Sequence, residues 1–118
     1  VLNYLGYMLI ERKENLGEAL DMIELAVEKS PQSGYIIDSL AWGLYQLGRY
    51  EEAITPMEQA ISLEPEDPIV NDHFGDVLWK VGRKREAYFQ WKRVLLFQPS
   101  EELRMDIEKK LKHGLEDL

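Results

Sequence analysis

The sequence predicts an all-α protein in which pairs of antiparallel helices stack side by side, and three observations support this prediction. First, the stretch from Gly34 to Asp67 recurs 34 residues later, with residues of the same size class at matching places. Second, apolar residues follow helical spacing in both halves of the stretch. Third, a glycine separates the halves and a proline follows them, where a helix cap and a helix end are expected.

The interval of 34 residues is specific because it preserves side-chain size at many places at once. The matching pairs are Ala41 and Gly75, Leu44 and Leu78, Gly48 and Gly82, Ala53 and Ala87, Met57 and Trp91, Ala60 and Val94, and Pro65 and Pro99. This pattern resembles the tetratricopeptide repeat (TPR), and the resemblance covers residues 1–99. It implies an α-solenoid in which helix pairs stack into a superhelix.

We divide the chain into three repeats and a final helix, which together form a single array over residues 1–118. The repeats are expected at 1–33, 34–67 and 68–99, and a C-terminal capping helix at 100–118. In repeat 1 one residue is inserted in the turn around Glu11 to Asn15, and Asn15 is the expected N-cap of a helix running to about Lys29. Because Val1 falls inside a helix of the extrapolated pattern, we interpret the chain as the C-terminal repeats of a longer bacterial TPR protein.

Small residues are expected where the helices of a pair cross. The apolar stripe around Ala41 should face the stripe around Ala53, so that the axes approach to about 8 to 9 Å. The same argument places Gly75 against Ala87. Pro56 should favour a kink within the second helix of repeat 2.

The last helix is expected to begin after a Ser100 N-cap, to end before Gly114 and to pack on the second helix of repeat 3. That second helix also carries Phe89 and Leu96 on a face that is polar in repeat 2, and we expect these two residues to be covered.

Charge and composition limit the classes of partner. The net charge of −8 argues against nucleic-acid binding, which depends on neutralising phosphates. Six basic residues against Glu86 give Lys80–Arg93 a charge of +5, which is typical of a solvated turn and helix face. The apolar opening of ten residues is too short to insert in a membrane and lacks the features of a signal peptide. The compartment stays open between the cytoplasm and a periplasmic or membrane-associated location.

No catalytic motif is present in the sequence. It lacks cysteine, a Gly-rich phosphate loop and the HExxH and G-x-S-x-G signatures, so we predict a non-enzymatic protein without a metal or cofactor. Asp72, His73 and Asp76 come nearest to a metal site. Asp72 and Asp76 share one face of the expected helix, whereas His73 directly follows Asp72 and points to a different side. The three side chains would therefore converge poorly on a metal ion.

A second stripe on the first helices faces away from the core within each repeat, and in the repeat family this stripe lines a concave groove. Aromatic residues interspersed with carboxylates suit a peptide with basic and apolar side chains. The predicted groove residues are Tyr7, Tyr35, Asp38, Trp42, Tyr45, Asp72, Asp76 and Trp79. Alternatively, Trp42 and Tyr45 pack between neighbouring first helices.

The resemblance also excludes one kind of ligand. TPR modules that grip the acidic C-terminus of chaperones use a clamp of Lys, Arg and Asn, whereas the matching positions here are Asn3, Tyr7, Ser39, Ile69 and His73. We therefore predict a protein-protein interaction scaffold that binds another partner segment in its groove. The alternative is a self-assembly module that forms a homo-oligomer through its ends or through Phe89 and Leu96.

Overall fold

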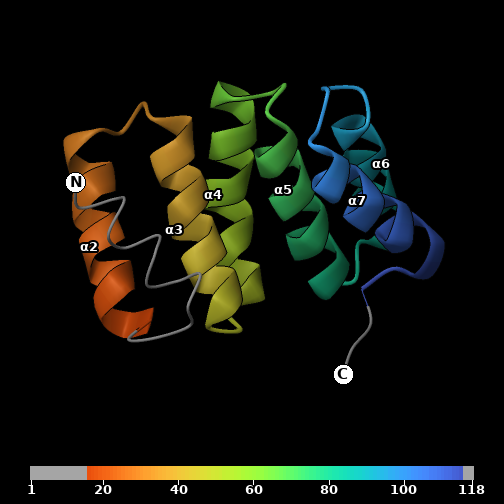
Figure 1. Cartoon of the computed structure of the whole chain (residues 1–118). Coiled ribbons are helices and arrows are strands. Elements are labelled where there is room, and N and C mark those ends of the chain that lie inside the picture. The colour runs from red at the N-terminus through yellow and green to blue at the C-terminus, as the bar shows by residue number, and fades with distance from the viewer. Residues whose placement is uncertain (1–15, 116–118) are drawn as a thin grey trace.

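The computed structural model describes residues 16–115, and within this range the only regular elements are α-helices (Figure 1). They are α2 (Leu16–Lys29), α3 (Gly34–Gln46), α4 (Tyr50–Leu63), α5 (Pro68–Lys80), α6 (Lys84–Val94) and α7 (Glu101–His113). The all-α prediction is confirmed. Asn3, Tyr7 and Asn15 lie outside the described residues. None of the helices in the described range is long and apolar enough to cross a membrane.

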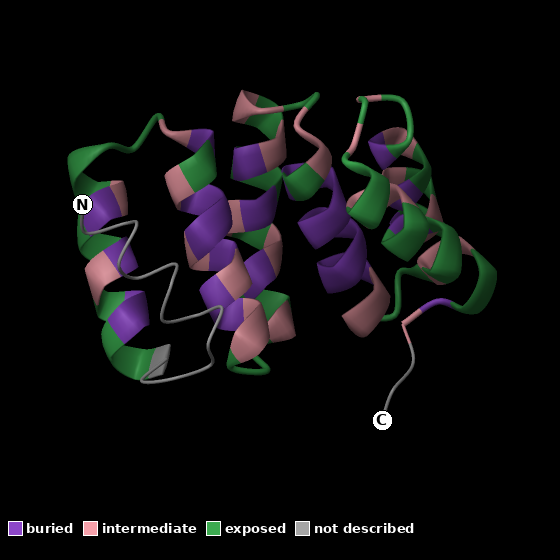
Figure 2. Ribbon diagram, in the orientation of Figure 1, coloured by how far each residue is buried: buried purple, intermediate pink, exposed green. Residues whose placement is uncertain are grey.

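The helices stack in chain order as antiparallel neighbours (Figure 1). The helix pairs α3–α4 and α5–α6 have the most extensive contacts, and α4 joins them by packing on α5. The last helix, α7, packs on α6 as expected. As a result α5 lies in the middle of the C-terminal half, and every residue from Val70 to Leu78 is buried (Figure 2).

Small residues and one large aromatic residue fill the interior of the pairs. Ala41 and Ala53 are both completely buried in one apolar cluster with Met57. The space beside Gly75 is filled by the indole of Trp91, which a Cβ atom at Gly75 would overlap. The sequence pattern had pointed to Ala87 at this place. Glycine is thus needed at position 75 because the large ring of Trp91 packs against it.

The turns follow the predicted chemistry. Gly48 and Gly82 adopt positive φ angles of 79° and 88° after the first helix of each pair. Ser100 Oγ accepts a hydrogen bond from the Leu103 amide and caps α7 at its start. The helix ends at His113, before Gly114, which has a φ of 69°. The helix α4 continues through Pro56 to Leu63.

Phe89 and Leu96 differ from the expectation that they would be covered. Phe89 is 60% exposed and Leu96 is 74% exposed. The side of α6 that carries Ala87, Trp91 and Val94 is fully buried, so Phe89 lies on the opposite, outer side. Most of the surface of both side chains is therefore open to solvent.

Candidate functional site

Five charged or titratable side chains form a buried layer between α3, α5 and α7, which we call the inner polar layer. Its members are Asp38, Asp72, His73, Asp76 and Lys110. The four members on α3 and α5 expose no more than 7% of their surface. Three of the eight predicted groove residues, Asp38, Asp72 and Asp76, belong to this layer. Buried charges of this kind are tolerated where each one is paired.

Asp38 and His73 pair across two first helices. His73 Nδ1 lies 3.0 Å from both carboxylate oxygens of Asp38, which joins α5 to α3. Burial is the strongest single influence on His73 and opposes its protonation. Asp38, with help from Asp72 and Asp76, outweighs burial and raises the pKa of His73. The pair therefore favours an imidazolium facing a carboxylate.

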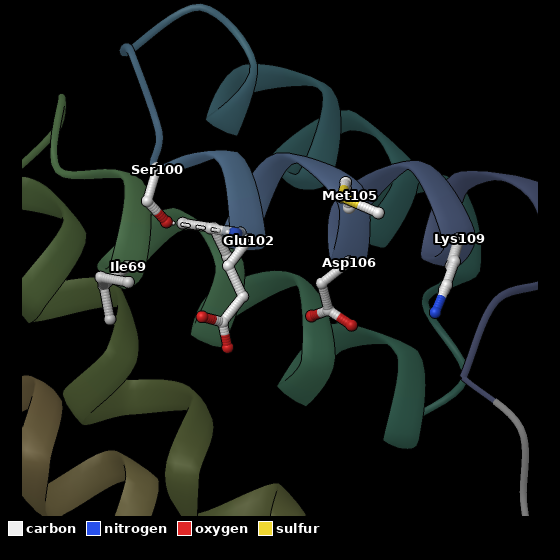
Figure 3. A pocket seen from close by; sticks show the side chains of 7 residues that line it. Ile69, Ser100, Glu102, Met105, Asp106 and Lys109 are labelled. Carbon is white, nitrogen blue, oxygen red and sulfur yellow. Dashed lines mark hydrogen bonds between the residues drawn. The ribbon is translucent and has the colours of Figure 1, made fainter.

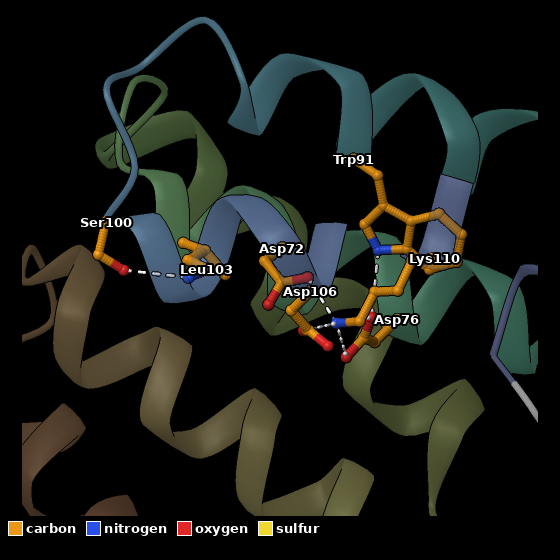
Figure 4. Close-up of polar contacts among 7 residues, drawn as sticks. All are labelled: Asp72, Asp76, Trp91, Ser100, Leu103, Asp106 and Lys110. Carbon is orange, nitrogen blue, oxygen red and sulfur yellow. Dashed lines mark hydrogen bonds and ion pairs between the residues drawn. The ribbon is translucent and has the colours of Figure 1, made fainter. Parts of the chain in front are cut away.

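Lys110 reaches from α7 to the two remaining aspartates of the layer (Figure 4). Its ammonium lies 2.7 Å from Asp72 Oδ1 and 3.0 Å from Asp76 Oδ1. Asp76 Oδ1 also accepts a hydrogen bond of 3.1 Å from Trp91 Nε1 on α6. One carboxylate thus connects α5, α6 and α7.

The carboxylates of Asp72 and Asp76 share the ammonium of Lys110 in this layer. Burial, followed by the nearby charge of Asp72, raises the pKa of Asp76 to about 6. For Lys110 burial opposes the charged form, but Asp76 and Asp72 outweigh it and raise the pKa of the ammonium. The ammonium therefore stays charged at neutral pH and neutralises part of the acidic pair.

Trp42 packs between two rings at the centre of the array. Its ring centroid lies 4.6 Å from that of Tyr45 and 3.9 Å from that of His73, nearly parallel to both. This is the arrangement expected if Trp42 and Tyr45 pack between first helices. Burial raises the pKa of Tyr45 well above its usual value.

Trp79 packs towards α6 and the end of α7. Its ring lies 5.6 Å from Trp91 and 5.7 Å, edge to face, from Tyr88. Gly114 lies directly against the indole, so that a Cβ atom there would overlap it. The close approach of the Gly114 backbone to the Trp79 ring explains why a glycine follows α7.

Among the predicted groove residues that lie within 16–115, Tyr35 is the most open to solvent, at 53% exposure. It lines a hollow of about 350 Å³ between the start of α3 and the α4–α5 turn. We call this the Tyr35 hollow, and its lining comprises Tyr35, Glu64, Pro65, Glu66, Asp67 and Pro68. The carboxylates of Asp67 and Glu64 raise the pKa of the Tyr35 hydroxyl. An aromatic ring here stands among acidic side chains.

The three residues considered as metal ligands point to different partners. His73 faces Asp38, whereas Asp72 and Asp76 face Lys110. Between residues 16 and 115, no group of three or more His, Asp and Glu side chains is arranged to hold a metal ion.

Comparison with known proteins supports the fold through structure alone. No family model matches the sequence, and no curated protein matches it. The first TPR domain of RPAP3 (Spaghetti), bound to the HSP90 peptide SRMEEVD, superposes with a TM-score of 0.82 at 18% identity over 97% of this chain and 90% of that one. The P58(IPK) TPR domain has a TM-score of 0.82 at 25% identity over 94% of this chain and 31% of that one.

A third similar structure is PcrH in complex with the chaperone-binding region of PopD, with a TM-score of 0.83 at 16% identity. It covers 96% of this chain and 87% of PcrH. The chain has the TPR fold.

Lys110 is the residue of the inner polar layer that the sequence did not lead us to expect. The repeat interval held the signal, because adding 34 to Asp72 and Asp76 gives Asp106 and Lys110. The final helix therefore places an acid and a base in register with two acids of α5. Asp106 also pairs with Lys110, at 3.3 Å.

Asn71 is a polar residue on the buried stretch of α5. It is completely buried, and its amide donates hydrogen bonds to the carbonyls of Pro65 and Asp67. Its Oδ1 accepts a hydrogen bond of 3.2 Å from Arg93 Nε. Asn71 thus fixes the α4–α5 turn, which forms one wall of the Tyr35 hollow, to α6.

Proposed function

We propose that this TPR array is a non-enzymatic protein-interaction scaffold that binds a partner segment carrying Lys or Arg next to apolar side chains. Two structures with the same fold hold a bound partner segment: the RPAP3 domain is bound to an HSP90 peptide, and PcrH is bound to a region of PopD. The observation that carries the proposal is the Tyr35 hollow, where an exposed ring stands among carboxylates.

The chemistry of the Tyr35 hollow favours a cation beside an apolar group. A Lys or Arg of the partner can pair with Glu64 or Glu66 and lie over the phenol ring at the same time. An acidic C-terminal peptide is disfavoured, because its carboxylates would meet those of the hollow. Ser39 and His73, two of the positions that match the chaperone clamp, are buried.

The binding role of the other predicted groove residues remains a proposal. Asp38, Asp72 and Asp76 are paired within the chain, so a partner that bound them would have to displace His73 or Lys110. Trp42, Tyr45 and Trp79 are half-buried and present only part of their rings. Tyr7 lies outside the described residues. We therefore expect the first contact of a partner at Tyr35.

The test is selection of binding peptides from a random library on the full chain, followed by titration of the selected peptides. The proposal predicts peptides enriched in Lys or Arg next to apolar residues, with affinity that falls about tenfold or more in Tyr35→Ala. Phe89→Ala, which truncates another exposed aromatic residue, is the matched control and should bind normally. Selected peptides that are acidic, or that bind Tyr35→Ala with full affinity, would rule out this site.

A second candidate function is self-assembly, and the exposure of Phe89 and Leu96 favours it. Phe89 on α6 and Leu96 in the turn after it are both large and exposed, and exposed apolar side chains that lie together are typical of a contact surface. Light scattering at several protein concentrations tests this function. The mean mass should rise with concentration, and a constant mass of one chain would exclude it.

A further inference from the structure

The outer side of α6 combines apolar and basic side chains. We define the α6 outer face as Arg85, Phe89 and Lys92, which lie at helical spacing on α6, together with Leu96 in the turn that follows the helix; all four residues are exposed. The neighbouring Arg93 places its guanidinium 5.9 Å from the Phe89 ring and 5.3 Å from the Phe97 ring. This face therefore offers two large apolar groups surrounded by positive charge.

The charges of the α6 outer face argue against pairing with itself. In a two-fold symmetric contact, the same patch meets itself on both copies. Arg85 and Lys92 of one copy would then approach Arg85 and Lys92 of the other, and such like-charge contacts disfavour the complex. The better complement is an apolar surface that carries carboxylates.

A surface of that kind lies between α5 and α7 of the same chain (Figure 3). The α5–α7 cleft has a volume of about 500 Å³ and is lined by Ile69, Ser100, Glu102, Leu103, Met105, Asp106 and Lys109. Ile69 is 42% exposed and Met105 is 52% exposed, so apolar surface is accessible in the cleft.

The charge of the α5–α7 cleft is opposite to that of the α6 outer face. Glu102 and Asp106 outnumber Lys109, which leaves a net charge of −1 on the lining. In Figure 3 both carboxylates point away from α7 on the side that faces α5. Lys110 pairs with Asp106 at 3.3 Å, whereas Glu102 is exposed at the start of α7.

We propose that two copies of this chain associate head to tail, with the α6 outer face of one copy docked in the α5–α7 cleft of the next. Phe89 and Leu96 would meet Ile69 and Met105, while Arg85 and Lys92 would meet Glu102 and Asp106. Because the two surfaces differ, a pair of bound copies still has one free α6 outer face and one free α5–α7 cleft. The assembly therefore continues beyond a dimer. This inference rests on the second candidate function, self-assembly.

Two charge variants test the pairing by sedimentation at several protein concentrations in low salt. The cleft variant, Glu102→Arg with Asp106→Asn, changes the net charge of the lining from −1 to +2. The face variant, Arg85→Glu with Lys92→Glu, reverses both cations of the α6 outer face. All four positions are exposed, and circular dichroism checks that each variant keeps the helical content of the wild type.

The mean mass of the wild type should rise with protein concentration. The rise should be smaller in high salt, because salt screens the attraction between opposite charges. Each variant alone should associate at least about tenfold more weakly, which corresponds to the loss of a contact between opposite charges. An equimolar mixture should associate again, because the basic face of the cleft variant fits the acidic cleft of the face variant.

The outcomes separate the two levels of the proposal. A wild type that keeps the mass of one chain at all concentrations overturns self-assembly and this inference together. If instead the wild type associates but the cleft variant associates equally well, self-assembly stands and the head-to-tail contact is wrong. A mixture that fails to associate when the wild type does also contradicts the pairing of these two surfaces.

Discussion

The Lys110 ammonium lies 2.7 Å from the Asp72 carboxylate and so connects α7 to the central helix α5. Side-chain exposure is 12% for Lys110 and 11% for Asp72, which keeps water from screening the pair. Together with the Asp38–His73 pair between α3 and α5, this contact engages carboxylates that were predicted to line an acidic groove.

Replacing Lys110 by Met should destabilise the protein markedly. The substitution leaves Asp72 and Asp76 buried without their cation, and breaking a buried pair in this way costs about 3 to 5 kcal/mol. Urea unfolding measures the change in the free energy of unfolding. Lys109→Met, at the exposed neighbouring position, is the control and should change stability by less than about 0.5 kcal/mol. Equal stability of the two variants would show that Lys110 has no structural role.

Stability should depend on pH through Asp76. Its folded pKa of about 6 lies above the usual value of 3.8, so the folded state binds the proton more tightly than the unfolded state. The resulting stability is present below pH 3.8 and is lost as the pH rises to about 6. The wild type should therefore lose stability relative to Asp76→Asn across this range in urea unfolding. A constant difference between the two proteins from pH 4 to 6 would refute the raised pKa.

His73 should keep its proton at a higher pH than an ordinary histidine. Its pKa is raised by Asp38 despite burial, so its contribution to stability is present below about pH 6.5 and is lost as the pH rises through the folded pKa. Titration of the imidazole by NMR measures this pKa directly. In Asp38→Asn burial should prevail and the pKa of His73 should fall. An unchanged pKa in this variant would mean that the 3.0 Å contact has no electrostatic effect.

Gly114→Ala should destabilise the protein more than Gly48→Ala. Both glycines have positive φ angles, where an alanine costs about 1 to 2 kcal/mol. At Gly114 the new methyl group would also overlap the Trp79 ring, whereas the space around Gly48 is open. Overpacking adds about 1 to 3 kcal/mol, which thermal or urea unfolding can resolve. If the two substitutions cost the same, the end of α7 does not pack on Trp79.

The sequence was sufficient to predict the fold because the repeat depends on local rules. Gly48 and Gly82 adopt the positive φ angles that their positions after a helix required, and Ser100 caps α7. The burial of Ala41 and Ala53 follows from helical periodicity alone. Each of these features depends on spacing within one helix pair or on a single residue type at a helix end.

The candidate site was less predictable because its side chains have partners far along the chain. Helical periodicity placed Asp72 and Asp76 on the stripe of α5 that faces away from the core within the repeat. It could not show that the ammonium of Lys110, 34 to 38 residues later in the chain, would pair with both carboxylates. The exposure of Phe89 was unpredictable for the same reason, because its apolar side chain led us to expect that another part of the protein would cover it. Helical spacing gives the direction of a side chain, whereas its partner depends on how α6 and α7 pack.

The most direct test of the proposed function is to map a selected peptide on the protein by NMR. The amide resonances of ¹⁵N-labelled chain are followed while the peptide is added. We predict that the largest shifts occur at Tyr35 and at residues 64–67 around the Tyr35 hollow, with small shifts on the outer side of α6. Shifts confined to other surfaces, with Tyr35 and residues 64–67 unchanged, would contradict binding at this hollow.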